Sequence, residues 1–365
     1  MSTDKTAALK ALNLELRDDD EPLHGRCSQN FDVSFVLMSL VLDLPQLYQK
    51  PPLDMLLAIL ELLDLPPASF ASVGGDAAGT VVHPDGVTDY LTKIIASPLS
   101  WLSTEDAREA VWDLASQRLS QRSGRTAMSK LTRTFCIPLS SDAIIDIALH
   151  EPALTEDNLG LKTWSSSYVL AKKLHILKDI HRLNDRPVLE LGAGTGLVGL
   201  AAAAVWHTDV ILTDLTSIVQ NLAQNVEANQ VRISANGGSV AAGVLDWASP
   251  EILHLADVEL GGTPRGHHHA KHKVTTILAA DPIYSPDHPR LLVNAVTTWL
   301  DSGERRDIAR LILAYPIREA YLPQIADLKS RLNAAGLAAL QQGEELTRDD
   351  WAEDVRVCWS VWGWR

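Results

Sequence analysis

The sequence contains few cysteines and no long apolar run, and both absences limit what the protein can be. Its three cysteines, Cys27, Cys136 and Cys358, are odd in number and far apart, which indicates neither a disulfide framework nor a zinc site. A reducing compartment is therefore the simplest expectation. The most apolar stretch, residues 33–42, is much shorter than the roughly 20 residues that span a bilayer, so we expect no membrane segment.

Basic residues are also scarce, because 32 lysines and arginines are outnumbered by 46 aspartates and glutamates, for a formal charge of −14. Such a surface repels phosphate backbones and disfavours direct nucleic-acid binding, whereas a basic or protein substrate is compatible with it. The opening residues, MSTDKTAALKAL, lack the charged start and apolar core of a secretory signal. We expect a cytoplasmic protein, or alternatively a nuclear one, that does not bind membranes.

The chain length of 365 residues suggests about two domains, and the sequence pattern changes near residue 150. Leucines recur at helical spacing between residues 53 and 63, before a pair of prolines, which predicts a helix that ends there. Ser103 is the predicted N-cap of a second helix, with Asp106 three residues later. Residues 1–136 therefore predict a mainly helical accessory region, to which we assign substrate recognition.

From residue 187 onward, short runs rich in β-branched residues alternate with helical runs. Five strands are predicted, at residues 188–191, 210–213, 243–245, 275–280 and 308–315. Strands that alternate with helices imply right-handed βαβ units and a mostly parallel α/β sheet. Near the end of the chain, apolar residues alternate from Val355 to Val361 without a following helix. This pattern predicts a final antiparallel strand at the edge of the sheet.

A glycine-rich turn after the first of these strands is the most informative feature. Gly192, Gly194 and Gly196 allow a tight turn and let a ligand approach the backbone closely. A dinucleotide fingerprint would need its third glycine one residue later, where this chain has Leu197. Glu190 would place a carboxylate close to where a pyrophosphate should bind. A cationic ligand is therefore favoured, and S-adenosylmethionine is such a cation.

Acidic residues also end the next two predicted strands. Asp214 follows Gly194 by 20 residues, at a position where an acid can bind ribose hydroxyls. Asp246 could accept a hydrogen bond from the adenine amino group, and the Trp247 indole could cover the ring. A glycine turn alone is often only strand-to-helix packing. With carboxylates at the carboxyl ends of successive strands, where open α/β sheets bind ligands, a cofactor site is the better interpretation.

Asp281 and Tyr284 are the predicted catalytic residues. They belong to the sequence Asp-Pro-Ile-Tyr after the fourth strand, where the proline ends the ladder at the carboxyl edge. Methyl transfer to an amine requires a neutral lone pair in line with the methyl carbon, which is mainly a matter of positioning. Asp281 can orient the amine and stabilise its developing charge, while Tyr284 can add a hydrogen bond and a wall. A simple turn is the alternative, since Asp-Pro is common in turns.

Four segments together resemble the seven-strand class I methyltransferases of the protein-lysine type with a DPxY motif, and they are residues 154–174, 189–200, 245–247 and 279–284. The resemblance covers residues 137–365 and implies a Rossmann-like, seven-stranded, mostly parallel sheet with an antiparallel C-terminal strand. It also implies S-adenosyl-L-methionine as the cofactor and Asp281 and Tyr284 as the residues that face the lysine. The cofactor contacts that it implies are Trp164, Gly192, Ala193, Gly194, Asp214, Trp247 and Ala280.

The segment TEDNLGLKTW and the helical N-terminal region look most like the fungal members that modify translation elongation factor 2. We therefore expect elongation factor 2 as the protein partner of a monomeric enzyme. One alternative is methylation of a nucleic-acid amine, because D-P-x-Y resembles the adenine-N6 motif. Ile283 in place of the usual second proline and the negative charge oppose it. Another is a non-catalytic binding module, which the intact Asp281 and Tyr284 disfavour.

Two further clusters have plainer interpretations. Histidines at 267, 268, 269 and 272 have a usable metal-ligand spacing. The glycines before them and the lack of a cysteine or nearby carboxylate favour a flexible insertion, so no metal is predicted. A basic run without acids favours a solvated helix end and linker over a surface that docks an acidic protein face. Its members are Arg118, Arg122, Arg125, Lys130 and Arg133.

Overall fold

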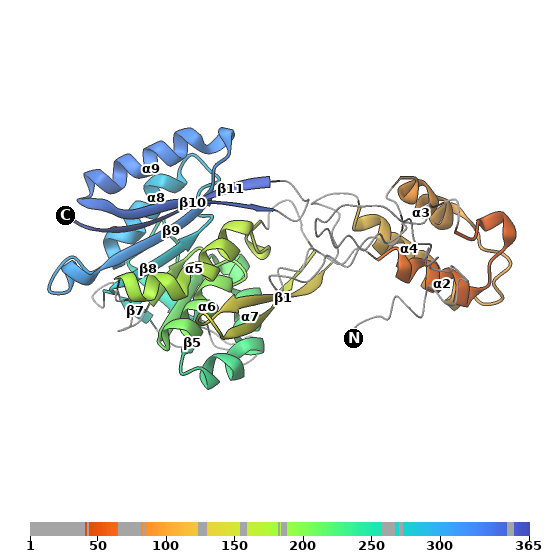
Figure 1. Cartoon of the computed structure of the whole chain (residues 1–365), viewed down its shortest axis with the longest axis horizontal. Helices are drawn as coiled ribbons and strands as arrows, with labels where there is room; N and C mark the ends of the chain where they lie inside the picture. Colours follow the sequence, from red (N-terminus) through yellow and green to blue (C-terminus); the bar gives the residue numbers. More distant parts are fainter. Residues whose placement is uncertain are drawn as a thin grey trace, which may run out of the picture. The chain divides into compact units, whose positions relative to one another are not determined.

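The structure is a computed structural model. It describes residues 41, 44–64, 82, 85–122, 130–153, 159–181, 183, 188–256, 267–269, 273–348 and 354–365. Cys27, Arg125, His272 and residues 154–158, all used in the predictions above, lie outside these ranges. The described residues fall into two compact units, one up to residue 122 and the other from residue 130 onward (Figure 1).

The first unit is helical and has a hydrophobic core of its own. It contains η2 (Leu47–Gln49), α2 (Leu53–Leu62), α3 (Val87–Ala96) and α4 (Glu105–Ser120). The leucine repeat does form a helix, α2, which buries Leu56 and Leu60. The N-cap of α4 is Thr104 rather than Ser103, because the Thr104 hydroxyl accepts the Ala107 N–H at 3.3 Å. The helix therefore starts one residue later than predicted.

Arg118, in the last turn of α4, and Arg122, just after the helix, form contacts inside the fold and not on a solvated linker. Arg118 donates to the Leu60 carbonyl at 2.7 Å and forms an ion pair with Asp64 at 2.5 Å. Arg122 donates to the Leu63 carbonyl at 2.6 Å. Both guanidinium groups thus cap the carboxyl end of α2, where cations are favourable. Neither arginine supports the hypothesis of a docking surface.

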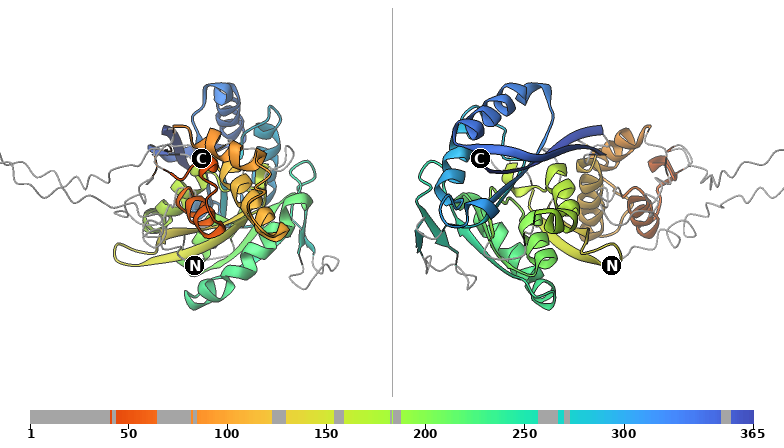
Figure 2. Two further views of the ribbon diagram at one scale, coloured as in Figure 1. Left: turned by 90° about the vertical axis from the view of Figure 1, so that its right-hand side faces the viewer. Right: turned by 60° about the vertical axis from the view of Figure 1, so that its left-hand side comes forward.

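The second unit is built on a large mixed sheet (Figures 1 and 2). Among the described residues it has nine strands, in the order β10-β11-β9-β8-β3-β4-β5-β6-β7. Its five central strands run parallel, and they are β3 (Val188–Leu191), β4 (Asp209–Asp214), β5 (Ser239–Val244), β8 (Thr276–Ala280) and β9 (Arg310–Pro316). At one end, β11 (Asp354–Trp364) and β10 (Leu337–Arg348) add two strands by antiparallel pairing.

The predicted Rossmann-like sheet is confirmed, with seven strands from β10 to β5 and a short extension beyond β5. The extension consists of β6 (Ile252–Leu255) and β7 (His267–His269), both paired antiparallel. The histidine run, interpreted as a flexible insertion, therefore supplies a strand. The C-terminal strand is antiparallel as predicted but does not lie at the edge. Instead β11 lies between β9 and β10 and pairs antiparallel with both, so its backbone groups find partners along both edges.

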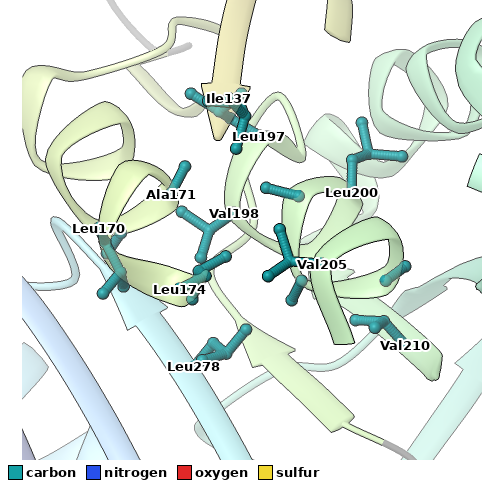
Figure 3. Close-up of a cluster of buried hydrophobic side chains, with 14 of the residues drawn as sticks. Ile137, Leu170, Ala171, Leu174, Leu197, Val198, Leu200, Val205, Val210 and Leu278 are labelled. Atoms are coloured by element: carbon teal, nitrogen blue, oxygen red, sulfur yellow. The ribbon is translucent and has the colours of Figure 1, made fainter. Parts of the chain in front are cut away.

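Helices cover both faces of the sheet. One face is packed by α5 (Ser165–His181), α6 (Leu197–Trp206) and α7 (Thr216–Ala235), and the other by α8 (His288–Trp299) and α9 (Leu322–Ala334). Figure 3 shows side chains of α5 and α6 meeting Leu278 of β8. Every residue of α6 is buried. No helix within the described ranges is both long and apolar enough to cross a membrane.

A separate hairpin of β1 (Leu131–Pro138) and β2 (Ile144–Glu151) is attached to this unit through side chains. The Asn229 amide accepts the Ala148 N–H at 3.0 Å and donates to the Ala148 carbonyl at 2.7 Å. Asn225 bonds both backbone groups of His150 in the same way. Two side-chain amides, one turn apart on α7, thus satisfy backbone groups of β2 as a neighbouring strand would.

The hairpin also contains a buried ion pair, and this pair provides a test of the fold. Arg133 and Glu151 lie 2.8 Å apart with 4% and 5% of their side chains exposed. Glu151→Ala leaves a buried guanidinium without its carboxylate, so we expect a loss of about 3–5 kcal/mol in the free energy of unfolding. Denaturant titration measures this loss.

The combined change Arg133→Met with Glu151→Leu should recover part of that loss, because no unpaired charge is then left buried. The matched control is Glu344→Ala, since Glu344 pairs with Arg356 at 3.7 Å on the surface. That control should change the unfolding free energy by less than about 1 kcal/mol. Equal losses for Glu151→Ala and Glu344→Ala would contradict a structural role of the buried pair.

Candidate functional site

The glycine turn lies between β3 and α6 and has the conformation that its sequence predicts. Gly192, Gly194 and Gly196 all have positive φ angles, of 70°, 57° and 93°, which are unfavourable for residues with a Cβ. The Ala193 N–H donates to the Thr213 carbonyl at 2.9 Å and so joins the turn to the end of β4. The predicted residues of this turn are therefore held together by backbone conformation and by the neighbouring strand.

Space around the turn is also restricted. A Cβ on Gly194 would lie 2.9 Å from the Gly160 carbonyl oxygen, so the segment that leads to Trp164 passes directly over the turn. The hydroxyls of Thr163 and Thr195 are 2.7 Å apart and strengthen this contact. Trp164, which is partly buried, immediately precedes α5. The structure thus brings the Trp164 segment to the glycine turn.

Asp214 holds the turn from the opposite side. Its two carboxylate oxygens accept the N–H groups of Gly194 at 2.8 Å and of Leu215 at 2.7 Å. Burial raises the pKa of Asp214 to about 6, although these two hydrogen bonds lower it. The sequence suggested only a contact with ribose, and that contact stays a prediction. The observed bonds give Asp214 a second task, which is to fix the backbone of the turn.

Glu190 lies beneath the turn and is 1% exposed. Its carboxyl group accepts the Gly199 N–H at 2.9 Å, in the first turn of α6. Burial raises its pKa to about 8, with the negative charge of Asp214 as a smaller contribution in the same direction. A Cβ on Gly199 would lie 2.5 Å from this carboxyl group. Glu190 therefore joins β3 to α6, and its contact with a cofactor stays a prediction.

The residues after β5 lie at the same edge of the sheet. The Trp247 indole is against the glycine turn, because a Cβ on Gly192 would lie 3.1 Å from its ring. Asp246 is exposed, and one of its oxygens accepts the Ala248 N–H at 2.8 Å. An exposed carboxylate beside an indole is suitable for binding a polar aromatic group, as the sequence suggested.

Asp281 and Tyr284 follow β8, the strand next to β3. Ala280 is the buried last residue of β8. Asp281 has a φ of 55°, and its N–H donates to the Ala314 carbonyl of β9 at 2.7 Å. Burial raises the pKa of its carboxyl group to about 6, while Arg318 and the hydrogen bond from Ser166 lower it. Tyr284 is 50% exposed, so a partly buried carboxyl group lies close to an accessible tyrosine.

Three residues near Asp281 and Tyr284 were not found from the sequence. The Ser166 hydroxyl donates to Asp281 at 3.2 Å from the start of α5. Arg318 follows β9 and acts on Asp281 through its charge. His288 opens α8, with its ring centroid 4.2 Å from that of Tyr284. Ser166 and Arg318 are distant from the DPxY motif in sequence, and His288 belongs to no motif. No spacing rule therefore indicated any of the three.

Taken together, the edge of the sheet is suited to a cationic ligand with an aromatic part. Carboxyl groups of Glu190, Asp214 and Asp281 lie at or within one residue of the carboxyl ends of three adjacent strands, β3, β4 and β8. Gly192 and Gly194 have no side chain, and a Cβ on them would meet the Trp247 ring and the Gly160 carbonyl, respectively. S-adenosylmethionine, with a sulfonium, an amino group and an adenine, fits these residues. No cluster of three or more potential metal ligands occurs among the residues that the structure describes.

Comparison with known proteins identifies the class of enzyme. A family model described as lysine methyltransferase matches residues 145–321. The chain is 31% identical over 281 residues to "Protein-lysine N-methyltransferase rrg1" of Schizosaccharomyces pombe, with 76% of this chain and 84% of the relative covered. It is 35% identical over 268 residues to "Protein-lysine N-methyltransferase EFM2" of Saccharomyces cerevisiae. That match covers 68% of this chain and 58% of the relative, a little over half of its length.

A search of solved structures also finds methyltransferases. One is a magnesium protoporphyrin IX methyltransferase from Synechocystis with bound SAM, with a TM-score of 0.37 and 18% identity, covering 53% of this chain and 78% of the other. The protein is a methyltransferase that uses S-adenosylmethionine. More narrowly, the chain belongs to the lysine methyltransferase family.

The raised pKa of Glu190 makes a testable prediction about stability. Its pKa of about 8 in the folded chain exceeds that of an exposed glutamate, so the folded chain binds one more proton than the unfolded chain between these values. Stability without ligand should therefore fall as the pH rises from about 4.5 to about 8, by at most about 1.4 kcal/mol per unit from this group. Glu190→Gln should flatten that slope, as denaturant unfolding at several pH values can measure. An unchanged slope would show that the carboxyl group is already ionised.

Proposed function

We propose that this enzyme methylates a lysine of translation elongation factor 2, in the cytoplasm and as a monomer. The observation that carries the catalytic part is that a partly buried carboxyl group, Asp281, lies close to the half-exposed Tyr284. Both follow β8, whose neighbour β3 leads into the glycine turn. An amine that reaches Tyr284 from solvent would therefore lie beside the cofactor.

We assign the cofactor site to the residues around the glycine turn. The positive-φ glycines leave room for the ligand, and the carboxyl groups favour its positive charges. Trp247 would cover the adenine beside Asp246, and Asp214 would bind the ribose from the carboxyl end of β4. The full proposed set is Trp164, Glu190, Gly192, Ala193, Gly194, Gly196, Asp214, Asp246, Trp247 and Ala280.

The chemistry assigned to Asp281 and Tyr284 is orientation and charge stabilisation. S-adenosylmethionine, when bound, supplies a methyl group activated by its attachment to a positive sulfur. Asp281 would accept a hydrogen bond from the incoming amine and direct its lone pair toward that methyl group. Its negative charge would then offset the charge that develops on nitrogen. Tyr284 would provide a second hydrogen bond and one wall for the lysine chain.

Ser166 and Arg318 would keep Asp281 ready for this task. The Ser166 hydroxyl holds one carboxylate oxygen, and the positive charge of Arg318 favours the ionised form. Near neutral pH a carboxyl group with a pKa of about 6 is mostly ionised. We therefore expect the transfer rate to fall below about pH 6, as Asp281 becomes protonated.

Elongation factor 2 as the substrate is supported by the resemblance to the fungal members that modify it. The same assignment agrees with a formal charge of −14, which is compatible with a lysine-bearing protein surface and disfavours a nucleic acid. The described residues up to 122 form a separate helical unit, and to residues 1–136 we assign recognition of the protein substrate.

The catalytic assignment is tested by Asp281→Ala. This change removes the group that orients the amine, so we expect methyl transfer to be abolished, with a loss of at least about 100-fold. Binding of S-adenosylmethionine, followed by calorimetry, should change little. The control is Asp287→Ala, an exposed carboxylate on the same connection that pairs with Arg290 on the surface. Full activity of Asp281→Ala would refute the assignment.

The substrate assignment is tested in cells that lack this protein. Mass spectrometry of elongation factor 2 from such cells should show the loss of methylation at one lysine. Expression of the intact protein should restore it, whereas Asp281→Ala should not. Elongation factor 2 with unchanged methylation would exclude it as the substrate. Transfer of labelled methyl to protein or to RNA in a lysate of these cells would then show which class of molecule is modified.

A further inference from the structure

The imidazole of His288 lies between the cofactor side and the lysine side of the proposed site. Its ring is perpendicular to that of Tyr284, with an angle of 88° and centroids 4.2 Å apart. It is also steeply inclined to the Trp247 indole, at 76° and 6.0 Å. Trp247 in turn lies against Gly192. A row of three rings therefore connects the glycine turn to the phenol of the DPxY motif.

The position of this imidazole is fixed by a well-anchored helix. His288 is the first residue of α8, which buries Leu292, Val296 and Trp299 in the core. The Trp299 indole N–H donates to the Pro250 carbonyl at 2.7 Å, three residues beyond Trp247. One helix thus holds both the imidazole and the segment that carries the indole.

Tyr284 depends on such a contact because half of its surface is exposed. Solvent does not restrict the exposed part of the ring, so its orientation depends on the side chains that touch it. The imidazole of His288 touches the ring, and its Nδ1 atom accepts the Tyr284 N–H at 3.4 Å. Burial lowers the pKa of His288, which favours a neutral ring that does not repel a cationic ligand.

We propose that His288 is a positioning residue that fixes the Tyr284 ring and thereby sets the number of methyl groups that the lysine can receive. This inference rests on the proposed lysine methylation. The amine must lie in line with the methyl group, and a displacement of about 1 Å is enough to slow transfer strongly. Each added methyl group also needs space beside the nitrogen. A tyrosine ring held in one place limits that space, whereas a released ring enlarges it.

The test uses three substitutions in the full-length enzyme, with elongation factor 2 from cells that lack the enzyme as acceptor. His288→Ala removes the ring and should lower kcat/KM for the acceptor by about 10- to 100-fold, while the Kd of S-adenosylmethionine changes by less than about threefold. His288→Phe restores a ring without nitrogen, and His288→Asn restores a polar group without a ring. The control is Arg290→Ala on the exposed side of α8.

Mass spectrometry of the product gives the ratio of mono-, di- and trimethyllysine. We expect His288→Ala and His288→Asn to shift this ratio toward more methyl groups, and His288→Phe to resemble the native enzyme. A native rate and ratio in all three variants would overturn the inference, as would rescue by Asn but not by Phe. If the native enzyme methylates no lysine in protein from these cells, the proposed function itself fails.

Discussion

The carboxylate of Asp214 is the interaction on which the rest of the site depends. It bonds two backbone N–H groups, one on the glycine turn and one on its own loop, and so fixes the ends of β3 and β4 relative to each other. The backbone bond from Ala193 to Thr213 supports the same junction. With that junction fixed, Trp247, which follows β5, contacts Gly192. The residues after β8 lie next to the end of β3, because these two strands are neighbours in the sheet.

Burial makes this arrangement costly, and the cost agrees with the proposal that a positive ligand binds beside these residues. Glu190, Asp214 and Asp281 all have pKa values raised by burial, so each destabilises the ionised chain to some degree. A fold selected for stability alone would place apolar residues there. Acidic groups at three adjacent strand ends are useful when a positive ligand occupies the site, because the ligand then supplies the missing counter-charge.

Much of the central sheet and of the site could be predicted from the sequence. Strand β3 has the predicted bounds, because its short run lies directly between Pro187 and Gly192, which leaves little choice at either end. Strand β10 was missed, since its polar residues, such as Gln341 and Glu344, do not alternate with apolar ones. The β1–β2 hairpin was missed because its attachment depends on asparagines some 75 residues away. Ser166 was missed for the same reason, since it contacts Asp281 from 115 residues away. His288 was missed although it is only four residues from Tyr284, because no motif of its own marks it.

The amides of Asn225 and Asn229 have a consequence for how the hairpin could change over time. A side-chain amide carries a donor and an acceptor with the spacing of a peptide group, so α7 imitates the edge of a strand. Main-chain pairing survives nearly any substitution, whereas this part of the attachment depends on the identity of the asparagines, to which Asn221 adds a bond to the His150 carbonyl. Because Phe135, Ile137 and Ile147 of the hairpin are also buried in the core with α5, α6 and α7, loss of the amides would loosen the edge of β2 while the apolar face of the hairpin stays packed.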